Sequence, residues 1–80
     1  MGYKEIIEQH VRHRLEDSFG KTLATLIIMG ASNAASMPII DPSRDDYIRF
    51  VDHLCKDQRV LDMWGAAGAA SANAQWKQLA

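Results

Sequence analysis

The chain has little cysteine: Cys55 is the single one among its 80 residues. One cysteine cannot form a disulfide within the chain, and it excludes zinc and iron–sulfur sites that take several cysteine ligands from one chain. This cysteine usage favours a reducing compartment, so we expect a cytoplasmic protein. The thiol falls within an apolar arc, where we expect it to be buried, with a raised pKa, and a poor nucleophile.

A long apolar run is also missing. The most apolar region, 23–35, is interrupted by Thr25, Ser32 and Asn33, and it is shorter than the roughly 20 residues that a membrane span needs. We therefore expect no membrane association. The N-terminal residues lack a signal-peptide pattern, and Ile6 stands where a myristoylation motif requires Ser or Thr, so neither export nor a lipid anchor is expected.

An excess of positive charge is absent as well. Nine Lys and Arg residues stand against ten Asp and Glu residues, which gives a net charge of −1. Nucleic-acid-binding domains are usually basic, so this charge balance disfavours a nucleic-acid partner. A helical nucleic-acid-binding dimer remains an alternative, and the basic residues available to it are Lys4, Arg12, Arg14 and Lys21.

The most regular feature that is present is a helical repeat of apolar residues. At about 100° per residue, side chains four positions apart drift slowly round one side of a helix, and the segment 3–19 has this spacing. The members of this stripe are Tyr3, Ile7, Val11, Leu15 and Phe19. The pattern predicts an amphipathic first helix, which Gly20 either ends or only weakens.

The middle of the chain is apolar or small on nearly every side. Over 22–37 this predicts a central, mostly buried helix. A strand over 23–29 is the alternative, but no second strand is apparent to pair with it. Pro38 moves the residue before it out of helical geometry, so we expect a turn over 37–42.

A third helix is predicted after this turn, with Asp41 as its N-cap and Pro42 at its first position. Its apolar residues cover one continuous arc: Tyr47, Ile48, Phe50, Val51, Leu54 and Cys55. Asp57 is a candidate cap for a fourth helix over 58–79, with Val60, Leu61, Trp64, Gly68, Ala72 and Leu79 on one face. Alternatively, the third and fourth helices form one long rod, because residues over 47–79 repeat in steps of four and three, as in a coiled coil.

These elements predict an all-α fold in a single helical domain over 1–80. One architecture is a small bundle of four short helices. The other is a hairpin of two long helices that dimerises into a four-helix bundle. A domain of this length buries only about 60% of its unfolded surface, so self-association is expected to supply part of its stability.

Two histidines on the first helix are candidate metal ligands. His10 and His13 lie three residues apart, on one face, and Glu16 follows at the same spacing. One chain supplies too few ligands, so a metal site would have to be assembled across a dimer, where four histidines and two carboxylates suffice for zinc or iron. Solvated histidines without a ligand are the simpler interpretation.

Candidate interface residues come from both ends of the chain. Arg14 interrupts the apolar stripe of the first helix, so we expect its charge to reach solvent, to pair with a carboxylate, or to meet an anionic partner. Trp64 and Trp76 flank a ridge of small residues that includes Gly68, which permits close helix packing or a groove for a partner. Trp76 lies off the main stripe, and we expect it to be exposed and to anchor an interface.

Function is predicted largely by elimination. The spacing of Ser, His, Cys and acidic residues predicts no catalytic set, and no phosphate-binding loop precedes a helix. We predict a non-enzymatic helical regulatory, adaptor or accessory subunit that acts through protein–protein contacts, as a homodimer or with a larger protein, and without a cofactor. The alternative is a metal- or cofactor-binding accessory enzyme or carrier whose site spans the dimer.

Overall fold

The computed structural model describes residues 2–38 and 40–80, and all regular secondary structure in these ranges is helical. The elements are α1 (Tyr3–Ile6), a π-helix η1 (Ile7–Val11), α2 (Arg12–Ala34), α3 (Arg44–Cys55) and α4 (Gln58–Gln78). The predicted all-α class is therefore confirmed. Met1 and Ile39 lie outside the described residues, so the turn predicted over 37–42 can be compared only in part.

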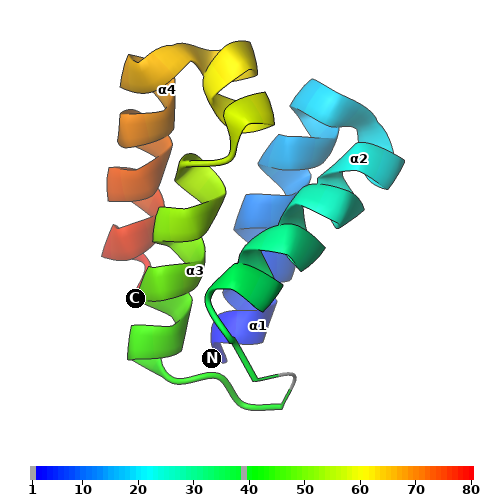
Figure 1. Ribbon diagram of the computed structural model, residues 1–80. Coiled ribbons are helices and arrows are strands. Elements are labelled where there is room, and N and C mark those ends of the chain that lie inside the picture. Colours follow the sequence, from blue (N-terminus) through cyan, green and yellow to red (C-terminus); the bar gives the residue numbers. More distant parts are fainter. Residues whose placement is uncertain (1, 39) are drawn as a thin grey trace.

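The chain runs up and down between the two ends of the molecule (Figure 1). It rises through α1, η1 and the first part of α2, descends through the rest of α2, rises through α3 and the first part of α4, and descends through the rest of α4. Both termini lie at the same end, where the Tyr3 hydroxyl donates to the carbonyl of Ala80 at 3.5 Å.

Two glycines turn the chain inside elements that are otherwise helical. Gly20 in α2 has φ 80° and ψ 170°, and Gly65 in α4 has φ 74° and ψ 167°. This backbone region is open essentially to glycine alone. We call these two positions the glycine elbows. Gly20 thus ends the first straight helical segment rather than merely weakening it.

The third and fourth helices are separate, so the prediction of one long rod is wrong. α3 ends at Cys55, and Asp57 caps α4 by accepting a hydrogen bond from the Arg59 backbone N–H at 2.9 Å. Hydrogen bonds from the Arg59 side chain also lower the pKa of the Asp57 carboxyl. The heptad-like repeat over 47–79 does not form one continuous face, because the break between α3 and α4, and then the turn at Gly65, change the direction in which the repeating side chains point.

The start of α3 was also predicted wrongly. Its N-cap is Ser43, not Asp41: the Ser43 hydroxyl accepts from the Asp46 N–H at 3.2 Å, and the Asp46 carboxylate accepts from the Ser43 N–H at 2.9 Å. This reciprocal capping box satisfies two helix N-terminal donors at once, whereas a single Asp cap satisfies one. Asp41 instead adopts a left-handed conformation with φ 52° in the preceding loop.

The core is centred on α3, which packs between α2 and α4. The predicted arc of α3 is confirmed, and the thiol of Cys55 is buried as expected, so that desolvation raises its pKa. The largest side chains with no exposed surface at the centre of the core are Val11, Leu15, Ile27, Tyr47, Phe50, Val51, Leu54 and Val60.

Two predictions of buried helical surface are confirmed only in part. The helix over 22–37 ends at Ala34, and Leu26 and Met29 on it are exposed rather than buried. The face predicted for α4 is confirmed at Val60 and Ala72, but after the elbow at Gly65 Ala69 and Trp76 are buried as well, and Leu79 is exposed. Among the described residues, no helix combines the length and the apolar character needed to cross a bilayer.

Candidate interaction surface

The four residues predicted to form an interface lie in one cluster between α2 and α4. The guanidinium carbon of Arg14 lies 4.7 Å from the ring centre of Trp64 and 6.0 Å from that of Trp76. The two tryptophan rings are 6.0 Å apart and meet edge to face. A Cβ atom on Gly68 would lie 3.0 Å from the Cβ of Trp64, so a side chain there would crowd this cluster.

The polar partners of this cluster could not be identified from the sequence. Arg14 donates to the side-chain oxygen of Gln75 at 3.1 Å, and the Trp64 indole N–H donates to the Ser18 hydroxyl at 2.8 Å. Phe19, which precedes one elbow, lies 6.1 Å from Trp64, which precedes the other. Arg14 therefore meets π faces and an amide, a cation–π arrangement rather than the salt bridge considered from the sequence.

The contacts of this cluster lie within the molecule and join α2 to α4. Trp76 is only 3% exposed, so the prediction that it is exposed is wrong. Its role as an interface anchor stays a prediction. The rotation of α4 at Gly65 turns this side chain toward the core instead of solvent. Trp64 and Arg14 are half-buried, and their contacts join the two elbow-containing helices to each other.

Replacing Arg14 by Gln is expected to lower the free energy of unfolding by about 1 kcal/mol, because the cation–π contacts are lost. Chemical denaturation followed by tryptophan fluorescence measures this change. Arg44→Gln is the matched control, since Arg44 is exposed at the start of α3, and its effect should stay within about 0.5 kcal/mol. Equal effects of the two substitutions would contradict a stabilising role for the Arg14 contacts.

The candidate metal ligands do not converge within one chain. His10 and His13 are exposed, Glu16 is half-buried, and the imidazole of His13 lies 3.8 Å from the Asp17 carboxylate. Across residues 2–38 and 40–80, no group of three His, Cys, Asp or Glu side chains is placed to hold a metal ion. A site shared by two copies stays a prediction.

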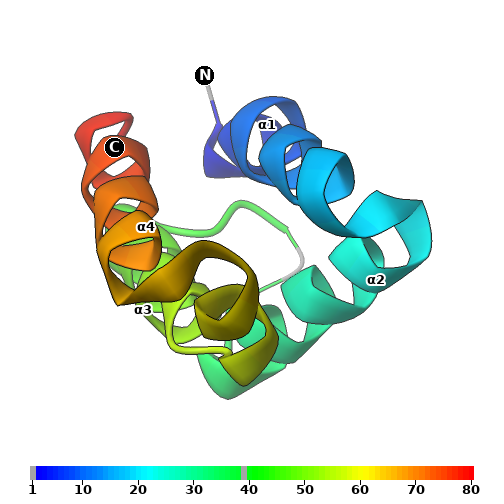
Figure 2. The ribbon, with the colours of Figure 1, turned by 90° about the horizontal axis from the view of Figure 1, so that it is seen from above.

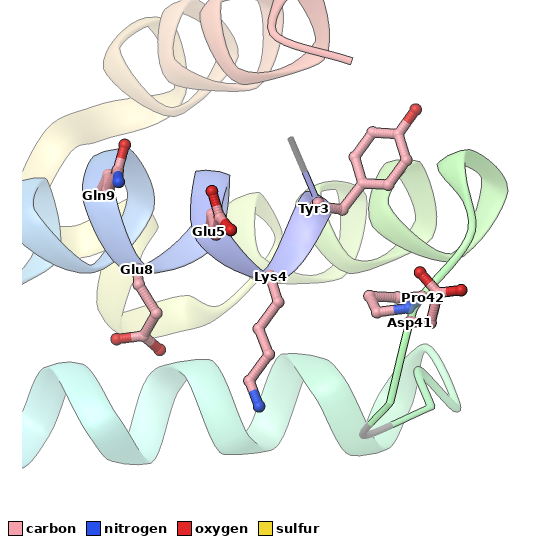
Figure 3. Close-up of a pocket in the computed structure, with 8 residues that line it drawn as sticks. Tyr3, Lys4, Glu5, Glu8, Gln9, Asp41 and Pro42 are labelled. Carbon is pink, nitrogen blue, oxygen red and sulfur yellow. The ribbon is translucent and has the colours of Figure 1, made fainter.

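The largest hollow described lies beside α1 and the loop before α3, and its volume is about 430 Å³. Figure 3 shows that its side chains diverge: Lys4 and Glu8 point toward α2, while Glu5 and Gln9 point the other way. An adjoining hollow of about 170 Å³ shares Lys4 and Glu8 and is largely apolar. Because these polar groups do not aim at a common point, the hollow offers no set of groups for catalysis.

The second half of α2 presents an exposed face without charge. Leu26 and Met29 on this face are 50% and 54% exposed. No charged residue occurs between Lys21 and Asp41 in the sequence. The face, which we call the uncharged face of α2, consists of Thr22, Leu26, Met29, Gly30 and Asn33, all exposed. Figure 2 shows this part of α2 at the outside of the molecule.

This face was missed because apolar residues over 22–37 were assigned to the core. Ala24, Ile27 and Ile28 do pack inward, but they occupy only one side of the helix. The exposed side of a surface helix usually carries charged and polar residues. The long stretch without charge was therefore the available signal, since it covers both the buried and the exposed side.

No protein-family model, no curated protein and no solved structure matches this chain. The surfaces described above therefore provide the basis for inferring a function.

Proposed function

We propose that this protein is a non-enzymatic helical subunit that binds another protein chain through the uncharged face of α2. The observation that carries this proposal is the half exposure of Leu26 and Met29 on a helix face without charge. Contiguous exposed apolar surface rimmed by polar residues is typical of protein interaction sites. Thr22 and Asn33 provide such a rim at the two ends of this face.

The energetics favour a covered face. Removing apolar surface from water contributes about 25 cal/mol per Å², and a fully buried Leu or Met side chain contributes about 1.5–3 kcal/mol. Within a single chain, Leu26 and Met29 gain only part of this stabilising free energy, because about half of each residue's surface remains exposed. Methionine also adapts its shape to different partner surfaces. A partner helix laid along α2 would recover the remaining contribution.

The other surfaces support this proposal less well. The Arg14 cluster is occupied by its own internal contacts, and the hollow beside α1 has diverging polar groups. Among the described residues, Ile40, Met63 and Leu79 are also large, exposed apolar side chains, but only Leu26 and Met29 lie within a single turn of one helix.

Site-specific photo-cross-linking tests this proposal. A benzophenone amino acid placed at position 29 and activated in the producing cells is expected to give a protein adduct, because the face is covered there. The matched control is the same probe at His13, which is exposed on a charged part of the surface. Leu26→Glu in the same chain should remove the adduct at position 29. An adduct that forms equally at both positions, or that survives Leu26→Glu, would refute the proposal.

A further inference from the structure

We infer that the uncharged face of α2 binds a second copy of this chain, with the two α2 helices antiparallel about a two-fold axis near Ile28. This inference rests on the proposed function and names the partner. In a two-fold contact each patch meets itself, so a charged residue close to the axis meets a like charge. The uncharged face carries no charged residue of its own that would meet its copy, since Lys21 and Asp41 are the nearest charges along the chain. Arg12, which donates to the Thr25 hydroxyl one turn before Met29, is a charge that borders this face.

The sizes of the side chains fit the same arrangement. The axis lies at the level of Ile28, with Leu26 two residues before it and Gly30 two residues after it. Because the two helices are antiparallel, Leu26 of each copy then lies opposite the partner's Gly30. A Cβ at Gly30 would meet nothing within 4 Å among the described residues, so open space lies over this position. A large residue then faces a small one twice, which is the arrangement that packs helices closely.

The ends of the face also match. In this register Thr22 comes close to the level of the partner's Asn33, so a hydroxyl faces an amide at each end. Both side chains can donate and accept hydrogen bonds. Met29 lies one residue from the axis, and the two copies of Met29 are therefore neighbours across it.

The contact is small, and this sets the expected affinity. A stable interface usually buries about 800 Å² on each partner, which is a large share of the 4725 Å² surface of this chain. One face of about three helical turns falls short of that area. We therefore expect a dimer that forms at micromolar or higher concentration and separates on dilution.

A charge-pairing experiment tests both the face and the symmetry. Wild-type protein in sedimentation velocity is expected to shift from the mass of one 8.9 kDa chain to twice that mass as concentration rises. Met29→Glu and Met29→Lys should each remain monomeric, because like charges meet at the axis. Mixed in equal amounts, the two variants should form a heterodimer at least about tenfold tighter than either forms alone.

Matched controls are His13→Glu and His13→Lys, which place the same charges before the Gly20 elbow, away from the uncharged face of α2, and should leave the wild-type dimer intact. Circular dichroism confirms that each variant keeps its helices. Wild-type protein that stays monomeric throughout would overturn the inference, as would single Met29 variants that dimerise like wild type, or a mixture that does not associate.

The result also separates this inference from the proposed function. A cross-linked adduct at position 29 with a mass other than two copies, together with monomeric wild-type protein, would overturn the self-contact but support a different protein partner. Absence of any specific adduct at position 29, with monomeric wild-type protein, would overturn both.

Discussion

Replacing either Gly20 or Gly65 by alanine is expected to lower the free energy of unfolding by about 3 kcal/mol. Both glycines have positive φ with ψ near 170°, a conformation that alanine adopts only with strain. Crowding is not the cause, because an added Cβ at either position would meet no described atom within 4 Å. Relative to the stability of about 5–15 kcal/mol that is usual for a domain, each loss is large.

Gly30→Ala is the matched control. Gly30 lies within α2, is exposed, and has equally open space around a Cβ, but its backbone is helical. Alanine is the better helix former by about 1 kcal/mol, so this variant should be more stable than wild type. Chemical denaturation at low protein concentration, chosen to keep the proposed self-contact from forming, measures all three variants. If Gly20→Ala or Gly65→Ala also stabilised the protein, the elbows would not exist as described.

Alkaline unfolding is expected to depend on Tyr47. This side chain is 0% exposed, and its hydroxyl donates to the Trp76 carbonyl at 2.7 Å. Burial, with smaller contributions from Cys55 and Tyr3, raises the pKa of Tyr47 to about 12 from the model-peptide value of 10.0. Below pH 10, Tyr47 is protonated in both the folded and the unfolded chain, so its stabilising contribution is fully present.

Between pH 10 and about 12 only the unfolded chain releases this proton. Unfolding therefore becomes easier as pH rises, by about 1.4 kcal/mol per pH unit, or on the order of 2–3 kcal/mol over this range. Tyr47→Phe should lose about 1 kcal/mol near neutral pH with the hydrogen bond, and should show a flatter decline above pH 10. Denaturation curves at several pH values measure both. An equally steep alkaline decline in the Phe variant would mean that other groups cause it.

Helices could be predicted from the sequence where apolar residues recur with the helical period. The arc of α3 is an example, because Tyr47, Phe50 and Leu54 can all be buried only in a helix packed on that side. The break at Gly65 was not predictable, since a glycine inside a helical pattern costs only about 1 kcal/mol and does not determine its own φ. The start of α3 depended on two competing caps, and the reciprocal bonds of Ser43 and Asp46 outweigh the single cap at Asp41.

The candidate surfaces were predictable to a different extent. Arg14 and Trp64 were selected because each was unusual in its own helix, and the structure brings them together at 4.7 Å. Their partners Ser18 and Gln75 carry no local signal, because those contacts join parts of the chain far apart in sequence. The exposed side of α2 could not be predicted from composition, because the composition of an apolar segment does not show which of its residues face solvent.

The meeting of the two elbows also bears on the order in which the chain folds. Each pair of neighbouring helices can form from contacts close in sequence, which require the closure of only short loops. The hydrogen bond from Trp64 to Ser18, in contrast, spans 46 residues and joins the first helical pair to the second. It can form only when both chain reversals are in place, so burial of the tryptophans should be a late event that follows helix formation.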